Sequence, residues 1–152
     1  HVDVRLIQKF QKKGGVMAQR ENKKQFIKDW IEKKLQGQGD PLEDLDSEVT
    51  FVIPGTENNP IFGTFSGIEE VKKFFGLLQE KVSQTFKVID CIAEDNQVIA
   101  FIEETLTRKD EPSKPYLNHT AWLFRLRHDR TTIKIVYLYT YDETLVPSEA
   151  LA

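Results

Sequence analysis

The sequence contains one cysteine, Cys91, so it cannot form a disulfide bridge within the chain. Disulfides are mainly a feature of secreted proteins, and a single thiol fits a reducing compartment. No apolar run approaches the roughly 18 residues that a membrane-spanning helix needs, and no secretory signal peptide opens the chain. We therefore expect a cytoplasmic protein.

The chain also lacks an excess of basic charge: 21 Lys and Arg against 24 Asp and Glu give a net charge of -3. A protein that binds a phosphate backbone needs a basic face, so nucleic acid is not an expected partner. There is no glycine-rich phosphate loop, nucleophile elbow or CxxC pair, and the three histidines have no metal-ligand spacing. We expect no metal and no cofactor.

What is present is the composition of an ordinary globular protein. The 152 residues are 39% hydrophobic and 30% charged, which is enough for one domain with a buried core. The aromatic content of 11% also allows an apolar cavity wall. Residues 1–16 contain a Lys-Lys-Gly-Gly break and are interpreted as an extension that need not be native, followed by a single domain over 17–152.

Hydrophobic periodicity predicts helices first and strands afterwards. A helix is expected over Glu21–Leu35, a helical turn at Pro41–Leu45, and a second helix that Ser66 caps, with Glu69 at capping-box spacing. β-branched and aromatic runs separated by turns predict five strands, at Glu48–Ile53, Thr85–Ala93, Gln97–Arg108, Tyr116–Arg127 and Thr131–Tyr141.

This order predicts an α+β domain in which a curved antiparallel sheet wraps over about three N-terminal helices. The last strand is apolar on both faces, with Ile135 and Tyr137 on one and Leu138 on the other. The helices can cover only one face of the sheet. A second copy is the expected cover for the other face, which predicts a homodimer through the sheet.

Three segments carry a family resemblance: VTFVIPG at 49–55, PIFGTFSGIEEVKKFF at 60–75, and YLYTYDETLV at 137–146. Their order resembles the SnoaL-like branch of the nuclear-transport-factor-2-like superfamily, which also holds ketosteroid isomerase. The resemblance covers about residues 22–146. It implies a cone-shaped, cystatin-like α+β fold with a pocket at its open end, a fold that serves enzymes, carriers and protein-binding modules.

The resemblance to ketosteroid isomerase also places that enzyme's three functional positions. They fall at Trp30, Ile53 and Trp122 in this chain. Ile53 cannot accept a proton, and an indole N–H is only a donor. Isomerisation by that set of groups is therefore not expected, and any catalyst should lie on the later strands.

Strand alternation in the family fold gives the expected pocket wall. A slip of one residue would exchange each inward set for its neighbours, including His119. Besides Trp30 and Ile53, the residues expected to face the cavity are Ile99, Phe101, Glu103, Thr105, Asn118, Thr120, Trp122, Phe124, Val136, Leu138, Thr140 and Asp142.

Asp142, Glu103 and His119 are the candidate catalytic residues. A carboxyl group in an apolar cavity has a raised pKa, which suits general acid–base catalysis. The resemblance adds weight to Asp142, because SnoaL-like cyclases use an Asp late in the sheet. Alternatives stay open: Asp142 can instead cap backbone N–H groups at the strand end or pair with Arg125 or Arg127, and His119 can be a hydrogen-bonded histidine on the dimer face. Glu104 is expected to be a solvated strand residue.

The sequence thus indicates a SnoaL-like small-molecule pocket protein. It is either a cofactor-free isomerase, cyclase or hydratase, or a non-catalytic binder of an apolar ligand, and whether it is an enzyme stays open. The alternative is a protein-interaction module that uses the outer face of the sheet. A large polar-lined cavity favours the first function, and a plugged cavity with an apolar exposed face and no self-dimer favours the second.

Overall fold

The computed structural model describes residues 4–56 and 58–142. Residues 143–146, the end of the third family segment, lie outside the described residues. The helices are α1 (Val4–Glu32), the one-turn 3-10 helix η1 (Lys34–Gln36) and α2 (Ile68–Lys81). The strands are β1 (Leu45–Ile53), β2 (Gly63–Ser66), β3 (Val82–Glu94), β4 (Gln97–Arg108), β5 (Pro115–Asp129) and β6 (Thr132–Asp142).

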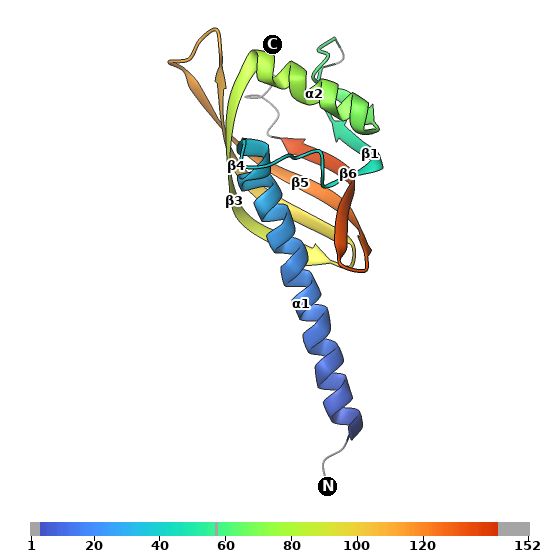
Figure 1. The fold of residues 1–152 in the computed structure, drawn as a ribbon. Helices are drawn as coiled ribbons and strands as arrows, with labels where there is room; N and C mark the ends of the chain where they lie inside the picture. Colours follow the sequence, from blue (N-terminus) through green and yellow to red (C-terminus); the bar gives the residue numbers. More distant parts are fainter. Residues whose placement is uncertain (1–3, 57, 143–152) are drawn as a thin grey trace.

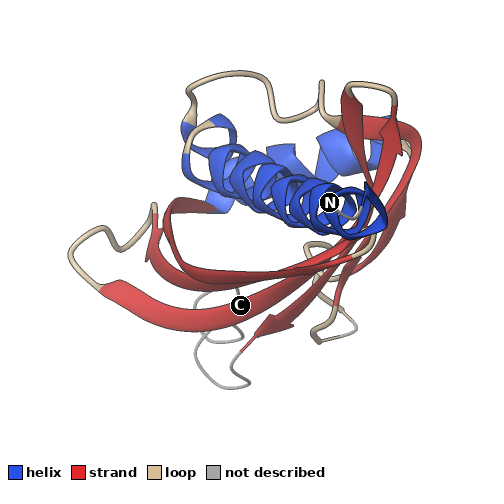
Figure 2. Ribbon diagram, turned by 90° about the horizontal axis from the view of Figure 1, so that it is seen from below, coloured by secondary structure: helices blue, strands red, loops and turns tan. Residues whose placement is uncertain are grey.

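The six strands form one curved sheet in the order β2-β1-β6-β5-β4-β3, with the helices on its concave side (Figures 1 and 2). The predicted α+β fold is confirmed. The sheet is mixed rather than wholly antiparallel, because the first strand, β1, runs parallel to the last strand, β6. The short strand β2, which no sequence pattern predicted, pairs with β1 at the edge.

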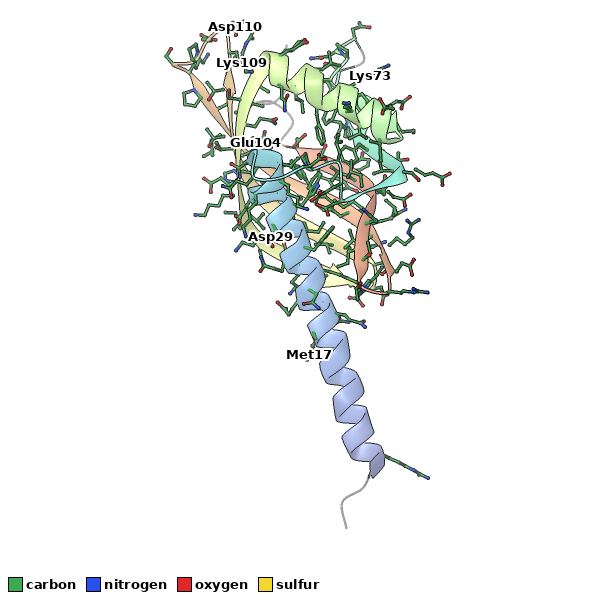
Figure 3. The ribbon with its side chains drawn as sticks, viewed as in Figure 1. Met17, Asp29, Lys73, Glu104, Lys109 and Asp110 are labelled. Carbon is green, nitrogen blue, oxygen red and sulfur yellow. The ribbon has the colours of Figure 1, made fainter. Side chains whose placement is uncertain are left out.

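Helix α1 packs on the sheet with only its C-terminal half. Ile27, Trp30 and Ile31 are buried in the core, whereas Met17 lies on the part of the helix that projects beyond the sheet (Figures 1 and 3). The helical stripe predicted from Glu21 onward is thus the packed part of a longer helix. Among the described residues, none of the helices combines the length and apolar character needed to cross a membrane.

Helix α2 begins differently from the predicted capping box. Ser66 belongs to β2, where it pairs with Thr50, so its backbone is extended. The N-cap is Gly67, whose φ of 83° favours glycine, and no side chain caps the helix. The carboxylate of Glu70, not Glu69, accepts a hydrogen bond from the backbone N–H of Ser66. The turn before α2 is therefore held by the Glu70 carboxylate and not by a Ser66 cap.

Candidate functional site

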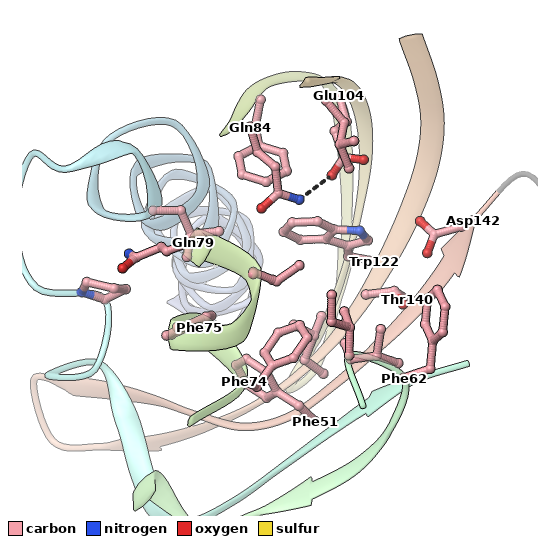
Figure 4. Close-up of a pocket in the computed structure, with 18 of the residues that line it drawn as sticks. Phe51, Phe62, Phe74, Phe75, Gln79, Gln84, Glu104, Trp122, Thr140 and Asp142 are labelled. Carbon is pink, nitrogen blue, oxygen red and sulfur yellow. Dashed lines mark hydrogen bonds between the residues drawn. The ribbon is translucent and has the colours of Figure 1, made fainter. Parts of the chain in front are cut away.

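A cavity of about 150 Å³ lies between the helices and the concave face of the sheet (Figure 4). Most of its wall is apolar and aromatic, and the acids Glu104 and Asp142 contribute its charged groups. The other lining residues are Trp30, Leu35, Pro41, Phe51, Ile53, Ile61, Phe62, Phe74, Phe75, Leu78, Gln79, Gln84, Phe86, Leu106, Trp122, Leu138 and Thr140.

Glu104 projects from β4 into this cavity and is only 6% exposed. Gln84 on β3 donates to its carboxylate at 3.1 Å, and Asn118 on β5 donates at 3.4 Å. Burial and the nearby charge of Asp142 raise the pKa of Glu104 to about 7, although the two amides oppose the shift. Glu104 is therefore partly protonated near neutral pH, which is the condition a general acid or base needs.

Asp142 enters the cavity from the end of β6. Burial raises its pKa too, and the polar side chains of Thr120, Asn118 and Thr140 oppose the rise. The two acids come from strands on either side of β5: Glu104 pairs with Asn118, and Asp142 pairs with Thr120, two residues further along β5. The register thus places two interacting carboxyl groups at one end of an aromatic cavity.

Three buried polar atoms around this acid pair have no hydrogen-bond partner within residues 4–56 and 58–142. They are Asn118 Oδ1, Thr140 Oγ1 and Trp122 Nε1, and each belongs to a side chain that is at most 7% exposed. Native interiors leave few such groups unpaired, because each costs about 1–3 kcal/mol. In Figure 4, Thr140 and the indole nitrogen of Trp122 lie on the side of the cavity that holds Glu104 and Asp142.

Six of the residues predicted to face the cavity lie in its wall. They are Trp30, Ile53, Trp122, Leu138, Thr140 and Asp142. Asn118 and Thr120 are buried on the same face of the sheet, beside the acid pair. Phe124 is fully buried but packs on the rings of Trp30 and Trp122 in the core. The N–H of Trp30 donates to Pro41 O at 2.9 Å and is already used.

The inward set predicted on β4 is wrong by one residue. Val98, Ala100, Ile102, Glu104 and Leu106 are buried, whereas Phe101 is 39% exposed on the outer face. The cause is the pairing with β5, which sets Glu104 opposite the buried Asn118 and Glu103 opposite the exposed His119. Glu103 and His119 therefore lie together on the outer face, away from the cavity, and Glu104 is not a solvated residue.

The last strand keeps its predicted inward residues near the site. Leu138 and Thr140 are buried and line the cavity with Asp142. A β-bulge opposite Arg125 and Leu126 changes the alternation below them, so that Ile135 is buried as well.

The two arginines considered as partners of Asp142 bind elsewhere. The guanidinium of Arg127 forms an ion pair with Asp46, and that of Arg125 lies 4.8 Å from the centroid of the Tyr137 ring. Within the described residues, no group of three or more His, Cys, Asp or Glu side chains could hold a metal ion.

Sequence reasoning missed Glu104 and Gln84. The neighbouring strand β5 held the signal for Glu104. Asn118 and Thr120 are expected to face inward, and residues of β4 that pair with them in the β4–β5 hairpin must face inward too. Gln84 lies just before the predicted start of its strand, so its side-chain direction was not considered.

Neither the family models nor the curated proteins yield a match to this sequence. Solved structures do match. An NTF2-like protein from Burkholderia xenovorans LB400 superposes with a TM-score of 0.63 at 20% identity, covering 84% of this chain and 94% of its own. A provisionally assigned SnoaL-like polyketide cyclase from Jannaschia sp. CCS1 gives 0.62 at 15% identity, with coverages of 80% and 85%.

A third structure, a hypothetical protein from Catenulispora acidiphila DSM 44928 with a ketosteroid isomerase-like fold, was solved in complex with trimethylamine. It has a TM-score of 0.60 at 15% identity, over 81% of this chain and 85% of that one. At these identities the similarity concerns the fold, and the fold is that of the NTF2-like proteins. The resemblance stated from the three sequence segments is confirmed at that level.

Proposed function

We propose that this protein binds a small molecule with an apolar body in its cavity and exchanges protons with it through Glu104 and Asp142. The observation that carries the proposal is the acid pair itself, two coupled carboxyl groups at one end of an aromatic cavity. Two neighbouring acids whose environments disfavour double ionisation are singly protonated in part of the molecules near neutral pH. One can then act as acid and the other as base.

The roles follow from the surroundings of each acid. Glu104 is the more deeply buried and has a pKa near neutrality, so it is the acid that carries the proton when the pair is singly protonated. Asp142 is then the carboxylate that accepts a proton from the bound molecule. Trp30, Trp122 and the phenylalanines of the wall hold the apolar body and exclude water. The reaction class is a cofactor-free isomerisation, cyclisation or hydration.

Deuterium exchange tests this proposal without a known substrate. Single-ring carbonyl compounds are incubated with the protein in D₂O, and loss of each C–H signal is followed by proton NMR. We expect the wild type to accelerate exchange in at least one compound. Asp142→Asn and Glu104→Gln should each slow it about a hundredfold or more, the usual contribution of a positioned acid or base. Glu103→Gln, the same change on the outer face, is the control.

Full exchange activity in Asp142→Asn would remove Asp142 from the mechanism. Equal losses in Glu103→Gln and Glu104→Gln would show that the effect is unrelated to the cavity. Circular dichroism of every variant separates lost chemistry from lost folding.

The outer face of the sheet supports a second proposal, association of two copies. Ile92, Phe101, Leu117 and Tyr141 are between 39% and 56% exposed there. The register aligns Phe101 with Tyr141 across β5, and Ile92 lies in the next row on β3. An apolar face of this kind on a sheet whose other face is covered marks an interaction surface.

We expect a dimer at micromolar concentration in analytical ultracentrifugation. Phe101→Asp should convert it to a monomer with an unchanged fold, because it places a charge in the centre of the apolar face. A wild-type protein that is monomeric at these concentrations would overturn the homodimer.

A further inference from the structure

The end of the cavity that holds the acid pair has more hydrogen-bond acceptors than donors. The carboxylates of Glu104 and Asp142 are acceptors when ionised, and the hydroxyl of Thr140 can accept as well as donate. Within the described part of the chain, Thr140 Oγ1 and the donor Trp122 Nε1 are buried in this wall without a hydrogen-bond partner. Asn118 Oδ1, which can only accept, is likewise unpartnered among these residues and lies beside the acid pair without lining the cavity. A ligand that completes this end must therefore bring donors.

The charge of the cavity also favours a ligand that brings hydrogen-bond donors. Among the described residues, its lining contains two acids and no lysine, arginine or histidine. A ligand that brought a carboxylate or phosphate would add a further negative charge beside the acid pair, which is strongly unfavourable at low local dielectric. A neutral donor such as an alcohol would form hydrogen bonds but leave the charge uncompensated. A cation satisfies both requirements, and charge-assisted hydrogen bonds are about twice as strong as neutral ones.

The aromatic wall suits the same kind of ligand. Trp122 and Phe86 pack edge to face with ring centroids 5.2 Å apart, and both line the cavity with Gln84 and Glu104. Aromatic faces attract organic cations, and more strongly where water is excluded. The volume of about 150 Å³ is of the size that holds a single six-membered ring.

We propose that the ligand of this cavity is an organic amine in its ammonium form, with a body about the size of one ring. The N–H donors of its head group pair with Glu104, Asp142 and the Thr140 hydroxyl, and the ring occupies the aromatic part. This inference rests on the proposed function, because it uses the same cavity and the same acids. It adds the chemical class of the ligand.

Three probes with one ring and different head groups test it: cyclohexylammonium, cyclohexanol and cyclohexanecarboxylate. Their dissociation constants are measured at pH 7.5 by ligand-observed NMR. We expect the ammonium to bind at least tenfold more tightly than the alcohol, which corresponds to about 1.4 kcal/mol, and the carboxylate to bind more weakly than both. An alcohol that binds as tightly as the ammonium, or a carboxylate that binds better, would overturn the proposal.

Two variants test whether the cavity acid Glu104 causes the preference for the ammonium. Glu104→Gln removes one negative charge and keeps the shape, so it should weaken ammonium binding about tenfold and change alcohol binding less than twofold. Glu103→Gln, with the same change in net charge on the outer face, should leave both unchanged. If Glu103→Gln weakens ammonium binding equally, the attraction is to the whole protein, and the ligand class is wrong.

The outcomes separate this inference from the proposed function. Variant-sensitive deuterium exchange together with no preference for the ammonium would overturn the ligand class and leave the acid pair in place. Binding of none of the three probes, together with no exchange in any carbonyl compound, would overturn both.

Discussion

Replacing Glu104 by Gln should stabilise the folded protein at neutral and alkaline pH. A buried glutamate whose pKa rises on folding destabilises the folded state once the carboxyl group has lost its proton. Its ordinary pKa is 4.5, and in the folded protein it is about 7. Glutamine has nearly the same shape and carries no charge. Its amide can also donate to Asn118 Oδ1, which has no partner among the described residues of the wild type.

The sign follows from proton binding. Between pH 4.5 and about 7, the unfolded chain has released the Glu104 proton and the folded chain still holds it. The folded state binds more protons in this window, so the free energy of unfolding falls as pH rises. Below pH 4.5 both states are protonated and the penalty vanishes. Above about pH 7 it is complete, at about 3 kcal/mol. The raised pKa of Asp142 contributes with the same sign.

Urea denaturation between pH 4 and pH 8.5 measures this effect. The wild type should lose stability as pH rises through the window, and Glu104→Gln should lose much less. At pH 8 the variant should be more stable by about 2–3 kcal/mol, or about 5–10 °C in Tm for a chain of this length. At pH 4 the two proteins should unfold at similar urea concentrations.

The matched control is Glu103→Gln, one residue away on the outer face, which should keep the pH dependence of the wild type. A wild type whose stability is flat between pH 5 and pH 8 would refute the assignment of Glu104 as a buried, partly protonated acid. So would a stabilisation of Glu104→Gln that is the same at pH 4 and pH 8.

Two further substitutions test contacts that hold the fold around the cavity. Lys23→Met should lower the free energy of unfolding in urea by about 1–3 kcal/mol, because the buried Lys23 Nζ donates to Asp95 O at 2.6 Å. The control Lys24→Met removes an exposed ion pair with Glu21 and should cost under about 0.5 kcal/mol. Equal costs would contradict a stabilising role for the Lys23–Asp95 hydrogen bond. Gly55→Ala should destabilise by about 1–3 kcal/mol, because a Cβ there would lie 2.1 Å from the Phe62 ring. In a Phe62→Ala background that cost should disappear, and an undiminished cost would place the strain elsewhere.

Five of the six described strands were predictable from the sequence because turns and β-branched runs mark them directly, whereas the short strand β2 was not. The bounds of β4 match the predicted Gln97–Arg108. Its inward face was not predictable from the strand alone, because Ile99 and Phe101 are as apolar as Val98 and Ile102. The choice between the faces is made by pairing with β5, a long-range contact that periodicity does not contain. Glu104 was missed for that reason, whereas Asp142 was found.

The parallel pairing of β1 with β6 affects the order in which the sheet can fold. Strand β6 lies inside the sheet, between β1 and β5, so the first and last of the described strands are neighbours. During synthesis, β1 and β2 have no sheet to join until β6 has left the ribosome. Such non-local pairing slows folding. A chain that stops before Thr132 would lose an internal strand rather than an edge, and the early strands would remain separated from the strands that carry Glu104.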